Sequence, residues 1–161
     1  MRFHVGSDHG GVLLLDVLVQ ALAAWSCPVL SRTGPPTPSE RADYPGVAVD
    51  VCRRVLSARA EGADDVFGLL VCGTGQGMAM TANKLPGIRA GVVGDVFSAK
   101  MIRAHNDANV LCLGERVLGT EVAMCLLRQF VDAAFEGGRH ARRVDMIASL
   151  TESAPGAGEG S

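Results

Sequence analysis

The sequence lacks several features that define common classes of protein. Its five cysteines are odd in number and contain no C-x-x-C or similar close pair, so neither a disulfide framework nor a zinc site is predicted. No apolar stretch is long enough to span a membrane, and the chain starts with a strand pattern instead of a signal peptide. A net charge of −2 argues against a general nucleic-acid binder. We therefore expect a cytoplasmic protein that binds neither membranes nor nucleic acids.

What the sequence does contain is typical of one globular domain. It has 161 residues, of which 48% are hydrophobic and 20% charged, enough to form a real core. Strand-like runs alternate with helix-like patterns, which predicts an α/β fold with a parallel sheet covered on both faces. We expect the domain to occupy residues 1–150. Residues 151–161 show no periodicity, and we expect a disordered tail there.

The expected elements follow from hydrophobic periodicity and from breaker residues. Strands are predicted over residues 2–6, 27–31, 66–72, 88–93 and 109–113. Helices are predicted over residues 12–25, 46–60, 96–104, 120–134 and 141–150, with one more after Gly77. Asp43 is the expected cap of the second helix, and the proline-rich segment 32–41 is a loop.

One stretch, residues 67–83, combines a buried strand, a cysteine and three alternating glycines before a helix. In open α/β sheets ligands bind where a strand passes to a helix, and a thiol beside a helix N-terminus is activated. Cys72 is therefore the first candidate for chemistry. The dinucleotide fingerprint G-x-G-x-x-G fails in both registers, because Met78 and Met80 stand where the third glycine belongs. There is no phosphate-binding G-x-x-x-x-G-K-[ST] motif either.

Parallel strands bring their carboxyl ends to one edge of the sheet. We expect four segments to meet there: residues 7–9, 72–77, Asp95 and 114–116. The cysteines other than Cys72 lie within apolar patterns and are interpreted as buried hydrophobes. On spacing alone, His105 is either a functional group or the partner of a helix end. The basic cluster 139–143 is either a solvated helix entry or a phosphate site, with Arg142 interpreted as solvated.

Seven motifs together resemble the ribose-5-phosphate isomerase B family, which includes the galactose-6-phosphate isomerase subunits. The resemblance covers about residues 2–148, and the motifs occur in the same order and spacing as in that family. Each motif alone is weak, but seven in order are specific. They are Gly6-Ser-Asp-His-Gly-Gly11, Asp43-Tyr-Pro45, Cys72-Gly-Thr-Gly-Gln-Gly77, Ala82-Asn-Lys-Leu-Pro-Gly-Ile-Arg-Ala90, His105-Asn-Asp-Ala-Asn109, Gly114-Glu-Arg116 and Arg139-His-x-x-Arg143.

The resemblance implies a three-layer αβα sandwich with a five-stranded parallel sheet, Rossmann-like or flavodoxin-like. It also implies a homodimer or dimer of dimers with active sites shared between subunits, no metal and no cofactor. The implied reaction interconverts an aldose phosphate and a ketose phosphate, here ribose 5-phosphate and ribulose 5-phosphate, through an enediolate. Such a site needs a base, an oxyanion site and a phosphate anchor.

The roles of individual residues in this reaction are assigned only from the resemblance to the family. Cys72 matches the proton-transfer base, and Thr74 with the amides of Gly73, Gly75 and Gly77 matches the enediolate site. His105, with Asp8 nearby, resembles the pair that opens the sugar ring. The remaining expected substrate and phosphate contacts, some of them from the partner chain, are His9, Tyr44, Asn106, Arg116, Arg139, His140 and Arg143.

Departures from the family pattern are few, and they leave alternatives open. Met78 stands where another branch of the family has a glutamate base, which places this chain in the branch that uses cysteine. Gly10 and Leu15 replace a usual alanine and lysine. The alternative substrates are a six-carbon sugar phosphate and an unphosphorylated aldose, with selectivity depending on loop 32–45 and the dimer seam. In another class, the chain is a module that binds a nucleotide or sugar phosphate without turnover.

Overall fold

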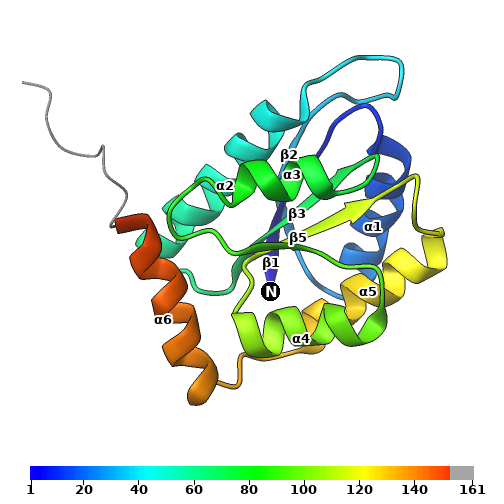
Figure 1. Ribbon diagram of the computed structural model, residues 1–161. Helices are drawn as coiled ribbons and strands as arrows, with labels where there is room; N and C mark the ends of the chain where they lie inside the picture. The colour runs from blue at the N-terminus through cyan, green and yellow to red at the C-terminus, as the bar shows by residue number, and fades with distance from the viewer. Residues whose placement is uncertain (153–161) are drawn as a thin grey trace, which may run out of the picture.

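The computed structural model describes residues 1–152 and contains one five-stranded parallel sheet (Figure 1). The strands are β1 (Arg2–Ser7), β2 (Val29–Thr33), β3 (Val66–Cys72), β4 (Ala90–Val92) and β5 (Val110–Gly114). They lie in the order β2-β1-β3-β5-β4. Every residue of β3 is buried, as expected for a central strand with a helix layer on each face. The predicted α/β class is confirmed.

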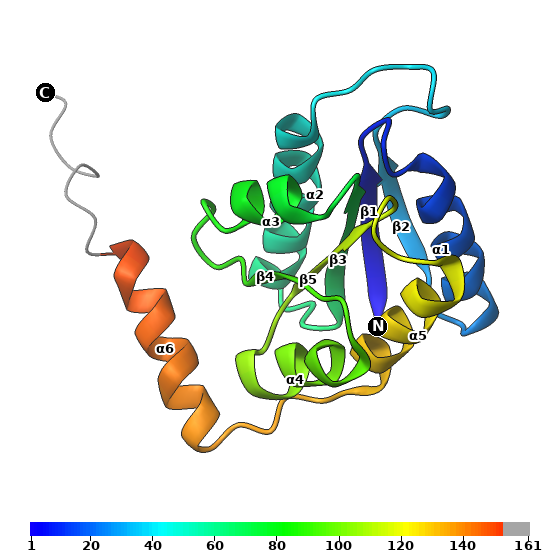
Figure 2. The same cartoon turned by 45° about the vertical axis from the view of Figure 1, so that its right-hand side comes forward.

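Six helices accompany the sheet, and five of them form the two outer layers (Figure 2). The helices are α1 (Val12–Ala24), α2 (Tyr44–Ala60), α3 (Gln76–Ala82), α4 (Val96–Asn106), α5 (Thr120–Asp132) and α6 (Arg139–Glu152). Helices α1, α4 and α5 bury apolar side chains against one face, and α2 and α3 against the other. None of the helices in residues 1–152 is long and apolar enough to cross a membrane. The fold is thus the three-layer αβα sandwich that the resemblance implies.

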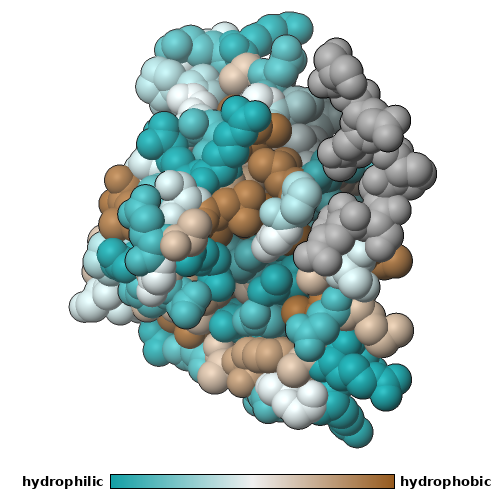
Figure 3. All heavy atoms as spheres, turned by 90° about the vertical axis from the view of Figure 1, so that its left-hand side faces the viewer, coloured by the Kyte–Doolittle hydropathy of each residue, from teal (hydrophilic) through white to brown (hydrophobic). Residues whose placement is uncertain are grey.

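Helix α6 lies apart from these layers. In Figures 1 and 2 it stands beside the sandwich, with its first turn near the end of α4. Three of its apolar side chains, Met146, Ile147 and Leu150, are 57%, 46% and 73% exposed. Seen from the α6 side, the surface carries apolar groups among polar ones (Figure 3). A helix with a partly apolar face needs a further surface to cover it.

The chain reverses its direction of winding between β1 and β3. These strands are neighbours in the sheet, yet β1 continues into α1 on one face and β3 into α3 on the other. The loops after the two strands therefore diverge and leave a crevice at the carboxyl edge. Asp8 and His9 follow β1 at this crevice, and the glycine turn follows β3. The topology therefore makes this edge the candidate ligand site.

Several predicted boundaries were wrong by a few residues. Strand β2 starts at Val29 instead of residue 27, after Ser26 takes a positive φ of 58°. Strand β4 covers three residues instead of six, and the side-chain amide of Asn83 bonds both backbone groups of Ala90 at this sheet edge. Asp43 occupies the N-cap position of α2, but its side chain makes no capping bond.

Helix α6 also differs from its prediction. It starts at Arg139 instead of residue 141 and continues to Glu152 instead of ending at residue 150. The predicted tail 151–161 is therefore wrong for its first two residues, which continue the helix. The rest of that prediction, over residues 153–161, lies outside the described residues.

Candidate active site

The cysteine singled out in the sequence ends the central strand and is held by the turn that follows it. The Cys72 side chain is buried, and its sulfur accepts a hydrogen bond from the backbone N–H of Gly75 at 3.1 Å. Gly75 has a φ of 79°, and a Cβ there would lie 3.1 Å from the carbonyl carbon of Leu113. Glycine is needed at this position for both reasons. The turn therefore fixes a donor directly against the sulfur.

The loop after β5 closes over the same turn. The backbone N–H of Glu115 donates to the carbonyl of Cys72 at 2.9 Å, and that of Arg116 donates to Gly73 at 3.0 Å. The Arg116 side chain then lies along the turn, with its Cδ 3.4 Å from where a Cβ of Gly73 would be. The guanidinium is thus placed beside the strand end that carries the thiol.

Asp8 and His9 reach the crevice from the neighbouring strand. Asp8 is buried, and its carboxylate accepts a hydrogen bond from the Gly10 N–H at 2.8 Å. A guanidinium nitrogen of Arg116 lies 3.5 Å from the Cβ position of Gly10. The His9 Nδ1 lies 3.3 Å from the carbonyl oxygen of Ala42. A carboxylate, an imidazole, a guanidinium and a thiol therefore share this edge, as predicted.

Tyr44 forms a wall over the glycine turn. Its side chain is 41% exposed, and a Cβ on Gly77 would lie 2.7 Å from the ring. The aromatic ring at the start of α2 therefore depends on a glycine in α3. Beside the turn, a cavity of about 500 Å³ is lined by residues that include Thr74, Gln76 and Gly94. Thr74 reaches this cavity, whereas Cys72, Asp8 and Tyr44 are not among the residues that line it.

The other cysteines are not placed for chemistry. Burial raises the pKa of the Cys52 thiol to about 12 and that of Cys112 well above its usual value. Cys27 is buried as predicted, but Cys125 is exposed, and its assignment as a buried hydrophobe was wrong. It lies on the outer side of the amphipathic helix α5. Asp95 accepts a hydrogen bond from the Ser98 N–H at 2.8 Å, which lowers its pKa and makes it the cap of α4.

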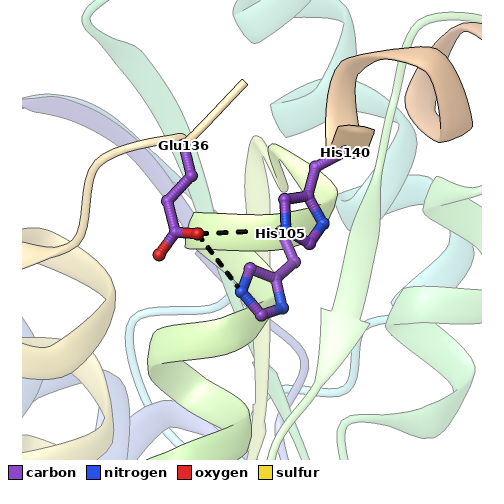
Figure 4. A group of neighbouring side chains, drawn as sticks. All are labelled: His105, Glu136 and His140. Carbon is purple, nitrogen blue, oxygen red and sulfur yellow. Dashed lines mark ion pairs between the residues drawn. The ribbon is translucent and has the colours of Figure 1, made fainter. Parts of the chain in front are cut away.

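A second group of candidate residues lies at the end of α4 and the start of α6. The imidazoles of His105 and His140 stack with ring centroids 4.0 Å apart and planes 7° from parallel. Figure 4 shows both rings beside the carboxylate of Glu136, which is 3.5 Å from the Nε2 of His105 and 3.8 Å from that of His140. Burial, followed by the charges of His105 and Arg139, lowers the pKa of His140.

Other basic and polar residues flank this pair. Arg139 and Arg143 come from the first turns of α6 and are exposed, and Arg142 is exposed beside them. Asn106 lines a groove of about 450 Å³ between α4, α6 and the loop before β4, together with Ile102, Ile147 and Ile88. The structure thus brings His105, Asn106, Arg139, His140 and Arg143 to one corner of the molecule.

The two groups lie at opposite edges of the sheet within one chain. Helix α4 follows the carboxyl end of β4 and returns to the amino end of β5, so His105 lies where the strands begin. Cys72 lies at the far end of β3, a strand of seven residues and hence about 20 Å long. The expected closeness of Asp8 to His105 is therefore absent within a single chain.

Comparison with known proteins decides the family. The model described as Ribose/Galactose Isomerase matches residues 3–147. The chain belongs to this family. It is 39% identical over 147 residues to ribose-5-phosphate isomerase B of Escherichia coli (strain K12), covering 91% of this chain and 94% of that protein.

Two further relatives bear on the fold and the substrate of this isomerase. Ribose-5-phosphate isomerase B from Mycoplasma genitalium, solved with bound ribulose-5-phosphate, superposes with a TM-score of 0.86 at 34% identity and covers 95% of this chain and 97% of its own. The D-erythrulose-4-phosphate isomerase of Pectobacterium atrosepticum is 35% identical over 143 residues, 89% of this chain and 90% of that protein. Names within the family therefore cover more than one sugar phosphate.

Sequence reasoning about this isomerase missed the residues that hold His105 and Asn106 in place. Asp107 ends α4 with a φ of 47°, in the left-handed region that few residues other than glycine adopt. Arg89 donates to its carbonyl at 2.8 Å and to its carboxylate at 2.5 Å, and Arg103 also contacts the carboxylate. We call Arg89, Arg103 and Asp107 the α4 clamp. The sequence signal for this position is the run Asn106-Asp-Ala-Asn109, because asparagine and aspartate commonly follow the end of a helix.

The α4 clamp leads to a prediction about stability. Asp107→Ala is expected to lower the free energy of unfolding by about 1–3 kcal/mol, because it strains the left-handed residue and leaves two partly buried arginines without their carboxylate. Denaturant unfolding measures the change. The control is Asp132→Ala, which removes the exposed pair with Arg128 and should cost less than about 1 kcal/mol.

A second substitution at the same position separates the two causes. Asp107→Gly permits the positive φ but still removes the carboxylate. It should therefore remain less stable than the original chain. Full stability of Asp107→Gly would show that the ion pairs contribute nothing and that only backbone strain matters.

Proposed function

We propose that this chain interconverts ribose 5-phosphate and ribulose 5-phosphate, with Cys72 as the proton-transfer base. The observation that carries the proposal is the buried sulfur at the end of β3, with the Gly75 N–H against it, beside Asp8 and Arg116 at the switch point of the sheet. The bound ribulose-5-phosphate in a relative that covers nearly the whole chain supports the substrate class.

The reaction needs a base that can reach both C1 and C2 of the sugar, and hydrogen-bond donors around the oxygens on these two carbons. Cys72 as thiolate takes the proton from C2 of the open-chain aldose, and the same proton or one from solvent is returned to C1. Negative charge meanwhile develops on the enediolate oxygens. The hydroxyl of Thr74 and the amides of Gly73 and Gly77 supply donors for that charge. The Gly75 amide, which the resemblance also assigns to this role, donates instead to the sulfur of Cys72. No step in this scheme requires a metal or an organic cofactor.

A second copy of the chain completes the site in this proposal. One edge of a chain supplies Asp8, His9, Tyr44 and Cys72. The other edge of its sheet carries His105, which we assign to ring opening, and the arginines of α6, which we assign to the phosphate. A homodimer with a two-fold axis would bring the second edge of one copy against the first edge of the other, twice. The exposed apolar side chains of α6 and the groove beside Ile147 support such an interface. The resemblance also implies a dimer of dimers, in which two such homodimers pair into a tetramer.

The substrate alternatives differ in size and charge. A relative named for a four-carbon sugar phosphate, and a family description that includes galactose, show why a panel of sugars is needed. Loop 34–43 contacts His9 through Ala42 and leads into Tyr44, so we infer that it contributes to the choice. A module that binds without turnover is the alternative of another class. Its weakness is that binding alone needs no thiol at the end of β3.

Removal of the proposed base tests the function directly. The unmodified protein should convert ribose 5-phosphate to ribulose 5-phosphate in a coupled assay, with or without a chelator. Cys72→Ala should lower kcat by about 100-fold or more, because general-base catalysis contributes that much. Cys125→Ser, at the exposed cysteine, should remain active. Turnover by Cys72→Ala at the original rate would contradict the assignment of the base. A preference for a different sugar would change the assigned substrate but not the assigned base.

The phosphate anchor is tested by two neighbouring arginines. Arg143→Ala should raise KM by about tenfold or more, because a charge-assisted hydrogen bond to the phosphate is lost. Arg142→Ala removes the same charge one residue away, at an exposed position that we interpret as solvated. It should change KM by less than about twofold. Equal effects of the two substitutions would indicate a general charge effect instead of an anchor.

The shared site predicts that two inactive variants restore activity when they are mixed. Cys72→Ala and His105→Gln should each be inactive alone. Each proposed site takes Cys72 from one chain and His105 from the other. In a mixed dimer, one site therefore contains both substitutions and the other site contains neither. Random mixing should therefore recover about a quarter of the original activity. No recovery in samples whose mixed dimers are verified by native mass spectrometry would mean that each site lies within one chain.

A further inference from the structure

Glu136 stands out because it is the only acid that contacts both histidines at the corner between α4 and α6, within the described residues. It lies in the segment that joins α5 to α6. Its backbone N–H donates to the carbonyl of Ala104 at 2.9 Å, so the segment is attached to the last turn of α4. That bond places the carboxylate 3.5 Å from the Nε2 of His105. No motif in the sequence had indicated Glu136.

The two imidazoles do not have the same partners. The Nε of Arg139 donates to the Nε2 of His140 at 3.4 Å. A ring nitrogen that accepts a hydrogen bond carries no proton, so this nitrogen of His140 cannot donate to Glu136. The lowered pKa of His140, caused by burial and by the positive charges around it, agrees with a neutral ring. His105 is therefore the ring whose Nε2–H can face the carboxylate.

The geometry also argues against a shared metal ion. Two histidines and a glutamate are a common ligand set for zinc. An imidazole nitrogen, however, binds a cation in the plane of its ring. The planes of His105 and His140 are within 7° of parallel, with centroids 4.0 Å apart, so no point beside Glu136 lies in both planes. The cluster suits a carboxylate that orients one imidazole and a neutral imidazole that packs against it.

We propose that Glu136 is a positioning residue that holds the Nε2–H of His105 and leaves its Nδ1 free to act on the sugar. This inference rests on the proposed function, in which His105 opens the furanose ring. Opening moves the proton of the C1 hydroxyl to a base while C1=O forms, the bond from C1 to the ring oxygen breaks, and that oxygen takes the electron pair and a proton. The net change is one proton moved from one oxygen to the other. One imidazole can take this proton and return it, and Glu136 stabilises the charged intermediate form of that ring.

The ketose offers a way to separate ring opening from proton transfer. In ribulose 5-phosphate the C5 hydroxyl that would close a five-membered ring carries the phosphate, so this sugar is open-chain. Exchange of its C1 proton with deuterated solvent requires enediolate formation only. Net conversion of ribose 5-phosphate, whose ring is closed, requires ring opening as well. The ratio of exchange to conversion therefore reports the contribution of His105 and its partner.

The test compares Glu136→Gln with the original protein in two assays, C1 exchange on ribulose 5-phosphate and net conversion of ribose 5-phosphate. We expect net conversion to fall by about tenfold or more and C1 exchange to change by less than about twofold, because proton transfer at Cys72 is untouched. Glu136→Asp should recover part of the conversion. Glu121→Gln, an exposed glutamate at the start of α5, is the matched control and should alter neither rate. A parallel fall of both rates, or no fall in conversion, would overturn the proposal.

A spectroscopic measurement tests Glu136 independently of turnover. Nitrogen-15 NMR of the imidazoles above the ordinary histidine pKa distinguishes the two neutral forms of the ring. His105 should carry its proton on Nε2 in the original protein. In Glu136→Gln this preference should weaken, because the amide can present either its oxygen or its NH₂ group. An unchanged His105 spectrum would overturn the role of Glu136, whereas absent isomerase activity with the expected spectrum would contradict only the proposed function.

Discussion

The common direction of the five strands is the constraint on which the rest of the structure depends. Because all carboxyl ends point the same way, the loops after β1, β3 and β5 meet at one edge and place Asp8, Cys72 and Arg116 together. The same rule sends every helix back to the other edge. His105, at the end of α4, is therefore kept away from Cys72 of its own chain. The candidate residues of this chain therefore form two groups at opposite edges of the sheet, and the homodimer that we propose would bring one group of each copy against the other group of its partner.

Close backbone contact keeps the thiol side of the site in one shape. Gly75 adopts a left-handed conformation against the end of β5, and Gly114 lies so close to the turn that a Cβ would be 2.6 Å from the backbone of Thr74. Neither position has room for a side chain. The sulfur of Cys72 and the amides around it are thus held by the backbone of two neighbouring strands, with few rotatable side chains involved. Such preorganised donors are what stabilise developing charge most effectively.

The sequence predicted the local features of the site but few of the contacts between segments that are distant in the chain. The run from residue 66 to Cys72 and the glycines after it predicted the strand, the turn and the candidate thiol, because those features depend on neighbouring residues. Which residues share an edge also followed, since it depends only on parallel topology. The order of β4 and β5, by contrast, depends on packing across the whole sheet.

Contacts between distant segments remained hidden for the same reason. Glu136 approaches His105 through a backbone bond between residues 32 positions apart, and Arg89 reaches Asp107 from another loop. No periodicity or spacing records either contact. The opposite error occurred at Cys125, which was predicted to be buried because its neighbours in the sequence are apolar. One side of α5 faces the core and the other faces solvent, and Cys125 lies on the solvent side.

The unequal surroundings of the two histidines complete the physical account. His140 is buried beside arginines, which favour a neutral ring, and His105 is partly exposed beside a carboxylate, which favours a proton on the facing nitrogen. Groups of the same kind acquire different roles when their environments differ in this way. The stacked ring of His140 limits how the side chain of His105 can rotate, while Glu136 determines which ring nitrogen of His105 carries no proton. The end of α4 therefore presents the imidazole of His105 in one orientation. The α4 clamp fixes its position, and Glu136, from the segment before α6, determines which of its nitrogens carries the proton.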